Sequence, residues 1–299
     1  MLPTIPQLLH QADQCLQANR APAKRLIQVY ALVWAVAVIV INLLSYFLDE
    51  ASAGLSGLSH AGTRNNLLVV NVGITLVLEL ALLLWQAGYS GAALSLSRGY
   101  TPKWQQLLWG LYQPHRYLLC GLVLFVRWFV LTYLVTMLFV FVMPPELLLD
   151  GDMITDVAYN GLMMLTGLVL AILIFNRRLL FFRMADGVDR PVYSVYREAI
   201  GLLRRRRGWV LRIDLHFWWY YLARVAIVVL PYGSLLLPET HTDWMLALDL
   251  GLLLISTAST VCLELTCRNR IWVTYALAYD ALLQEWEESA KKTLPEGEE

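Results

Sequence analysis

Long apolar runs, separated by short polar segments, dominate this sequence. Six of them reach the roughly 20 residues that a helix needs to cross a bilayer, and they cover residues 26–48, 67–88, 118–143, 157–182, 213–237 and 244–267. Only 15% of the residues are charged, against about 25% in a soluble domain. The sequence therefore predicts an all-α fold, a polytopic membrane helix bundle with six transmembrane helices.

Lysine and arginine residues lie almost entirely on one side of these spans. The segments before span one, between spans two and three, between four and five, and after span six are basic, whereas the opposite segments contain one basic residue, Arg64. Basic segments stay in the cytoplasm. We therefore expect a multi-pass protein of the cell (cytoplasmic) membrane with both termini inside. Residues 1–299 form a single membrane domain, in which 268–299 make a tail helix with a frayed acidic end.

The first apolar run is followed by Ala51, Ser52 and Ala53, which resemble a signal-peptide cleavage site. The run is about 22 residues long, whereas the apolar core of a signal peptide has about 7–15. We therefore predict an uncleaved first span.

The cytoplasmic segments share a spacing that indicates an internal repeat. Pro6, Pro102 and Pro191 each open an amphipathic segment, and an arginine follows each of them by 14 residues. Each segment precedes a pair of spans, so we predict three copies of one unit, an interfacial helix followed by a transmembrane hairpin. In this interpretation the helix lies at the headgroups with its apolar face toward the lipid. The alternative is that prolines and arginines are simply common in such loops.

Ionisable residues inside spans are costly and are therefore functional candidates. The leading ones are Glu79, Arg127, Asp214 and Arg224, and Asp249 and Glu264 also lie in spans. Helical rise puts Glu79 at a depth similar to that of Arg224 or Arg127. A pair between them could relay an ion or substrate, or could only fix helix register.

Asp214 and His216 could suggest a proton site, although positions two apart face different ways on a helix. The aromatic cluster 217–221 could line a substrate groove, but packing between helices is the plainer interpretation. The run Arg204, Arg205, Arg206 and Arg207 could bind anionic phospholipid headgroups or a nucleotide, or could only anchor the topology.

Motifs of soluble enzymes and metal sites do not occur in the sequence, which lacks zinc-protease, nucleophile-elbow, P-loop and dinucleotide-binding patterns. Cys15, Cys120, Cys262 and Cys267 form no metal-binding pair, and we interpret them as small apolar fillers. We expect no cofactor, no metal and no nucleic-acid partner.

Two stretches resemble a known family. They are GYSGAALSLSRGYTPKWQQLLWGL at 88–111 and the region 183–282, with a core at Ala185, Asp186, Pro191, Tyr196, Glu198 and Ala199. In these the chain looks like the multipass membrane proteins of Firmicutes bacteria catalogued as domain of unknown function 975. This chain departs from that pattern after Pro231 and Tyr232, where a full sixth span intervenes. The resemblance implies an integral membrane protein with no agreed activity.

Two functions remain in competition. The first is a non-enzymatic membrane component that acts through lipid or protein contacts, as a transporter accessory or in envelope stress. The alternative is a small transporter or channel that uses Glu79, Arg127 and Arg224. An intramembrane enzyme is a distant third, because no nucleophile and base stand together in the sequence.

Overall fold

The computed structural model describes residues 2–53, 61–122, 178–187, 189–204, 206–230 and 242–293, together with 126, 130 and 134. Every regular element in these ranges is helical, which confirms the all-α prediction at this level. The elements are α1 Ile5–Ala18, α2 Arg20–Ala53, α3 Ala61–Ser97, η2 Trp104–Leu108, α4 Trp109–Tyr112, α8 Arg178–Asp186, α9 Val192–Arg204, α10 Arg207–His216, α11 Trp218–Val229, α12 Thr242–Leu263, the π-turn η4 Glu264–Arg268, and α13 Asn269–Thr293.

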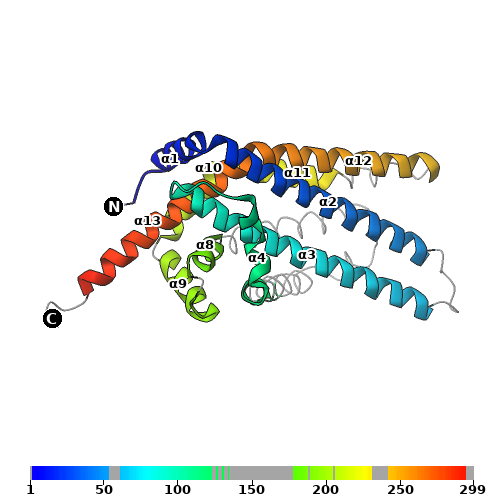
Figure 1. Ribbon diagram of the computed structural model, residues 1–299. Helices are drawn as coiled ribbons and strands as arrows, with labels where there is room; N and C mark the ends of the chain where they lie inside the picture. The colour runs from blue at the N-terminus through cyan, green and yellow to red at the C-terminus, as the bar shows by residue number, and fades with distance from the viewer. Residues whose placement is uncertain are drawn as a thin grey trace, which may run out of the picture.

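Three long helices, α2, α3 and α12, extend together toward one end of the molecule (Figure 1). At the other end lie α1, α8, α9, α10 and α13, which we call the cap (Figure 1). Both chain termini also lie at the cap end (Figure 1). The elongated shape follows from the length of α2 and α3, which have 34 and 37 residues.

Two stretches in the described part of the chain, Arg20–Ile41 and Gly251–Ser289, are long and apolar enough to cross a membrane. The outer face of α2 exposes a row of apolar side chains that includes Leu32 and Val36, a pattern that is costly in water. Predicted spans one, two and six fall on α2, α3 and α12 with η4. Most of spans three and four lies outside the described residues.

Predicted span five, 213–237, is not one straight helix where it is described. The chain breaks at Phe217, which has non-helical dihedrals (φ −98°, ψ 18°) between α10 and α11. The side chain of Phe217 is buried in the core, so tertiary packing overrides an apolar run that shows no break in sequence. The predicted start at Ile213 therefore lies inside α10, and residues 231–237 lie outside the described part.

Aromatic side chains from α3, α8 and α13 fill the centre of the cap. Tyr89, Phe182, Tyr275 and Tyr279 are all at most 1% exposed, and the ring of Trp272 stands edge-on to Tyr89 with centroids 5.8 Å apart. Helix α13 is therefore the central element of the cap, although the sequence indicated only a tail helix.

The predicted amphipathic helix at the N-terminus is present as α1, but its apolar face does not point to lipid. Leu8, Leu9 and Ala12 are buried in the core, and α1 packs mainly on α13. The predicted orientation, with the apolar face against the headgroups, is therefore wrong for this helix.

Glycines let two backbones touch where α3 crosses the following segment. A Cβ at Gly88 would stand 2.0 Å from the carbonyl oxygen of Leu107, and a Cβ at Gly110 would stand 2.0 Å from that of Leu84. Only hydrogen fits in these positions. Small residues at these two positions therefore allow α3 and the following segment to approach within backbone contact.

Helix α3 ends at a glycine with left-handed backbone. Gly99 has φ 80°, and the amides of Gly99 and Tyr100 donate to the carbonyl oxygens of Leu96 and Ser95. This is a Schellman cap, which favours glycine because it requires positive φ. It stops α3 where Arg98 can reach α8 and α13.

Candidate functional site

An ion pair is buried in the π-turn between α12 and α13. Glu264 and Arg268 are four residues apart, with side chains 1% and 4% exposed, and their Oε2 and Nη1 atoms are 2.7 Å apart. Removing one partner of such a pair costs about 3–5 kcal/mol because the other charge stays buried. π-turns are frequent at functional sites, so the surroundings of this pair matter.

Helix α11 brings two more polar groups to the same carboxylate. Tyr220 donates its hydroxyl to Oε1 of Glu264 at 2.8 Å, and Nη1 of Arg224 is 3.9 Å from the same oxygen. One carboxylate therefore faces two guanidinium groups. The described charges at this point sum to a net positive one.

Arg268 also lies among aromatic rings from α2, α3 and α13. Its guanidinium carbon is 4.1 Å from the ring centroid of Tyr30, 5.3 Å from that of Tyr89 and 5.4 Å from that of Trp272. The π-faces of these rings attract the cation. Within the described part of the chain, the Nε atom of Arg268 is buried without a hydrogen-bond partner.

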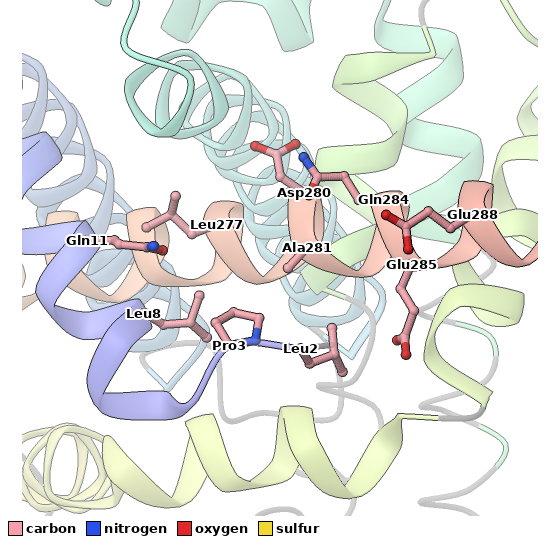
Figure 2. Close-up of a pocket in the computed structure, with 10 residues that line it drawn as sticks. All are labelled: Leu2, Pro3, Leu8, Gln11, Leu277, Asp280, Ala281, Gln284, Glu285 and Glu288. Carbon is pink, nitrogen blue, oxygen red and sulfur yellow. The ribbon is translucent and has the colours of Figure 1, made fainter.

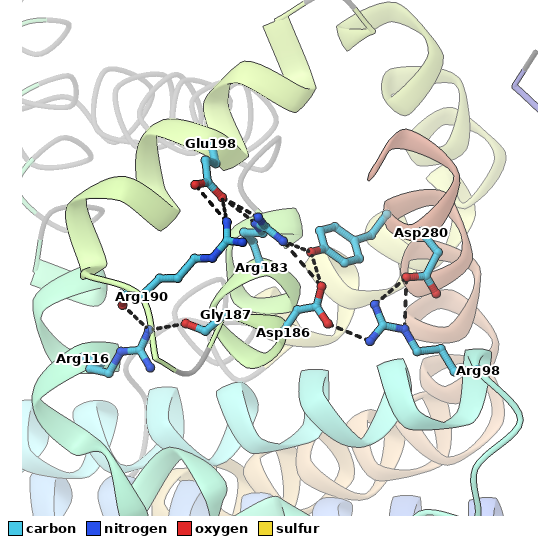
Figure 3. A network of polar contacts seen from close by, with 9 residues as sticks. Arg98, Arg116, Arg183, Asp186, Gly187, Arg190, Glu198 and Asp280 are labelled. Carbon is cyan, nitrogen blue, oxygen red and sulfur yellow. Dashed lines mark hydrogen bonds and ion pairs between the residues drawn. The ribbon is translucent and has the colours of Figure 1, made fainter. Parts of the chain in front are cut away.

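A second polar cluster joins α3, α8, α9 and α13 in the cap (Figure 3). Arg98 at the end of α3 bridges Asp186 on α8, at 2.7 Å, and Asp280 on α13, at 2.8 Å. Buried Arg183 donates its Nε to Glu198 on α9 at 2.9 Å. Carboxylates and guanidinium groups alternate along the cluster, so four elements are tied together.

Tyr279 completes this cluster from α13. Its hydroxyl accepts from Arg183 at 3.3 Å and donates to Asp186 at 3.0 Å. Burial raises the pKa of Tyr279 above its ordinary value, which keeps the hydroxyl protonated as a donor. Partial burial alone would raise the pKa of Asp186, but the hydrogen bonds and positive charge of its partners, above all Arg98, lower it below the ordinary value.

Arg116 fixes the turn between α8 and α9. Its Nη2 donates to the carbonyl oxygens of Gly187 at 2.7 Å and Arg190 at 2.9 Å (Figure 3). The side chain is buried. It therefore satisfies backbone groups that a sharp turn leaves without helical partners.

A cavity of about 320 Å³ lies between the N-terminal residues and α13 (Figure 2). It contains three carboxylates, Asp280, Glu285 and Glu288. Asp280 already pairs with Arg98, and Glu285 pairs with Arg206. The cavity therefore has little charge left with which to attract a basic ligand.

The sequence-based candidates in the spans divide into three groups. The side chain of Glu79 and all of Arg127 lie outside the described residues, so a pair between Glu79 and either arginine stays a prediction. Arg224 has Glu264 as a described ion-pair partner. Asp214 accepts a hydrogen bond from Tyr275 on α13, while His216 is exposed.

The arginine run is spread over several environments. Arg204 ends α9 and Arg207 begins α10, and both are exposed. Arg206 pairs with Glu285, with Nε 3.1 Å from Oε2. Arg205 lies outside the described residues. Sequence reasoning treated these side chains as equivalent, because the partner of Arg206 is 79 positions away.

Within the described ranges, no group of three or more His, Cys, Asp and Glu side chains is placed to hold a metal ion. No family model matches the chain, and no curated protein or solved structure matches it either. The likeness to domain of unknown function 975 therefore stays a prediction.

Proposed function

We propose that this protein is a six-span membrane protein with cytoplasmic termini, and that its cap works at the cytoplasmic face through non-enzymatic contacts with lipid or with a protein. The two helices that are long and apolar enough to cross a membrane support this proposal. So does the position of both termini at the cap end. The six spans are those proposed from the sequence.

Exposed aromatic side chains after α3 are the observation that carries this proposal. Tyr100, Trp104, Trp109 and Tyr112 are between 40% and 73% exposed, and exposed Lys103 lies among them. Such rings are expensive to leave in water but favourable at the membrane–water interface, where one end stays wet. We infer that this segment rests at the headgroups, as the interfacial helix of the second repeat unit.

The three-fold repeat is part of the same proposal. Pro6 lies in the first turn of α1, Pro191 immediately precedes α9, and Pro102 lies two residues before η2. These positions support a common unit. In the first unit the helix is held by α13 rather than by lipid, so the units would have diverged in what they contact.

Exposed Arg204 and Arg207 supply positive charge that would attract anionic lipid headgroups. Each basic residue near an anionic surface contributes about 1 kcal/mol of attraction. Replacing both with glutamine should therefore weaken the preference for anionic lipid by about thirtyfold. The preference is measured in nanodiscs that contain mixed phosphatidylglycerol and phosphatidylethanolamine, by mass spectrometry of the lipids that leave with the protein.

The matched control replaces both residues with lysine, which keeps the charge and should keep the preference. A protein partner that is retained by the wild type and lost from the glutamine variant would support the protein-contact form of the proposal. An unchanged lipid preference with no partner lost would contradict both forms.

Transport is the second candidate, and the cavity beside Arg224 favours it. This cavity, of about 250 Å³, lies between α2, α3, α11 and η4. A transporter that uses Glu79, Arg127 and Arg224 should lose flux in a Glu79→Gln variant that is still folded and inserted. Absence of flux in wild-type proteoliposomes under several ion and solute gradients would reject this candidate.

A further inference from the structure

The cavity beside Arg224 and Arg268 combines charge with an apolar wall. Two arginines and an amide, Gln86, lie on it together with aromatic and aliphatic side chains. The described lining residues are Tyr30, Trp34, Val38, Leu82, Leu83, Gln86, Arg224 and Arg268. Polar groups that converge in an otherwise apolar pocket are typical of a ligand site.

Positive charge in this cavity exceeds the described negative charge. The Oε2 atom of Glu264 pairs with Nη1 of Arg268 at 2.7 Å, and its Oε1 atom accepts a hydrogen bond from the hydroxyl of Tyr220 at 2.8 Å. Arg224 stands 3.9 Å from Oε1, too far for a good hydrogen bond. Among the described residues, the two guanidinium groups therefore share one carboxylate, and both oxygens of that carboxylate already accept closer hydrogen bonds.

Arg268 provides a second, independent sign of a ligand. The side chain is 4% exposed, and among the described residues its Nε finds no hydrogen-bond acceptor. A buried N–H of a charged group is costly without an acceptor. An anion in the cavity would accept from this atom and from Arg224 together.

The volume of the cavity and its place beside the predicted spans favour a lipid headgroup over a whole small molecule as the ligand. At about 250 Å³ the cavity is smaller than the roughly 300–1,000 Å³ of sites that enclose a whole small molecule. Val38, Leu82 and Leu83 lie within predicted spans one and two, so a hydrocarbon chain can continue from the cavity into the bilayer. Arg268 follows span six on its cytoplasmic side.

We propose that this cavity binds the phosphate headgroup of an anionic phospholipid from the cytoplasmic leaflet, with Arg224 and Arg268 as its donors. Guanidinium groups suit phosphate because their N–H donors are arranged as a fork. The inference rests on the proposed membrane function and names one tightly held lipid within it, distinct from the lipids attracted by Arg204 and Arg207.

Phosphatidylglycerol is the probe, and native mass spectrometry of the full-length protein released from nanodiscs is the measurement. The wild type should retain one phosphatidylglycerol in preference to phosphatidylethanolamine. Arg224→Gln should lower this retention by at least about tenfold, the effect of losing one charge-assisted hydrogen bond. Arg212→Gln, an exposed arginine on α10, is the control and should retain the lipid.

Val38→Trp fills the cavity without changing its charge and should also abolish retention, which guards against a fold defect particular to Arg224→Gln. Loss of the bound lipid to inorganic phosphate in the buffer would assign the site to a free anion and overturn the lipid assignment. Equal retention by wild type and both cavity variants would overturn the site itself.

The carboxylate of Glu79 could pair with Arg224 in place of a lipid phosphate, and this alternative is tested separately. Glu79 is three, four and seven positions before Leu82, Leu83 and Gln86 in the sequence, so its carboxylate is the acid to test against a lipid. If its carboxylate rather than a lipid compensates Arg224, the wild type would hold no lipid and Glu79→Gln would gain one, which overturns the proposal. If the cavity variants retain phosphatidylglycerol while Arg204 and Arg207 still set the overall lipid preference, the cavity proposal fails and the proposed function stands.

Discussion

Gly88 and Gly110 occupy the tightest described crossing, where α3 meets the segment that follows it. Each hydrogen faces a backbone carbonyl group of the other segment, so neither position can accept a side chain without moving backbone. These glycines stabilise the crossing because they have no Cβ, and their exposed fraction alone would not identify them as important.

Gly88→Ala should destabilise the protein by about 1–3 kcal/mol or more, because its methyl group would lie 2.0 Å from the carbonyl oxygen of Leu107. Gly201 is an exposed position on α9, where an added Cβ would meet nothing within 4 Å, so Gly201→Ala should be neutral or stabilising by up to about 1 kcal/mol. Thermal unfolding in detergent, followed by tryptophan fluorescence, measures both. A Gly88→Ala variant that unfolds at the wild-type temperature would refute the close crossing.

How far the sequence predicts single residues depends on how local their partners are. Glu264 and Arg268 are four apart, a helical spacing that could have identified the pair. Tyr220 is 44 residues from Glu264, and no local pattern links them. The sequence indicated Arg224 and Glu264 as separate candidates in different spans, and their contact at 3.9 Å depends on how α11 packs against η4, which no local pattern predicts.

Elements in the cap are held together by charge as well as by apolar contact. Asp186 on α8 receives Arg98 from α3 and Tyr279 from α13, so one carboxylate joins three helices. Because those contacts need the ionised form, the stability of the cap depends on pH.

The direction of this pH dependence follows from the pKa of Asp186, which is lowered in the folded protein. Its contribution is fully present above the unfolded pKa, about 3.9, and is lost as pH falls through the lower folded value. Wild-type unfolding temperature should therefore decline between about pH 5 and pH 3. Asp186→Asn should be less stable by about 1–3 kcal/mol at pH 7 and should decline less steeply.

The control for this prediction is Asp189→Asn, an exposed carboxyl in the same turn, which should reproduce the wild-type profile. Parallel profiles for Asp186→Asn and the wild type would show that Asp186 does not supply the acid sensitivity.

Element prediction succeeded where periodicity is strong and failed where packing decides. Helix α1, Ile5–Ala18, lies where the sequence predicted an amphipathic segment opened by Pro6, because its apolar residues recur at helical spacing. Its burial on α13 could not be predicted, since lipid and protein present equally apolar surfaces to such a stripe. The break at Phe217 was missed for the same reason, as an apolar run looks alike whether it is straight or bent.

At the scale of the whole molecule, the N and C marks both lie at the cap end (Figure 1), and the basic residues of α8, α9 and α10 belong to the cap. The sequence predicts that this end faces the cytoplasm because its segments carry nearly all lysine and arginine residues. The six-span count and this orientation stay predictions that topology mapping can test.

Single cysteines in a variant without the native four provide that test. Thr240→Cys, in the predicted outer segment 238–243, should react with a membrane-impermeant maleimide in intact cells. Glu287→Cys, exposed on α13, should react only after the cells are permeabilised. Labelling of both positions, or only of Glu287→Cys, in intact cells would reject the proposed orientation.

The π-turn η4 also sets the rotation of α13 about the helix axis relative to α12. A turn closed by i→i+5 bonds holds about one residue more than an α-turn, and each residue advances a helix by about 100°. The extra residue lets α12 face α2 and α11 while α13, on the same continuous helix, faces α1, α3 and α8. Losing one residue between Glu264 and Arg268 would rotate Tyr275 and Tyr279 out of the cap, so chain length here is constrained more tightly than residue identity.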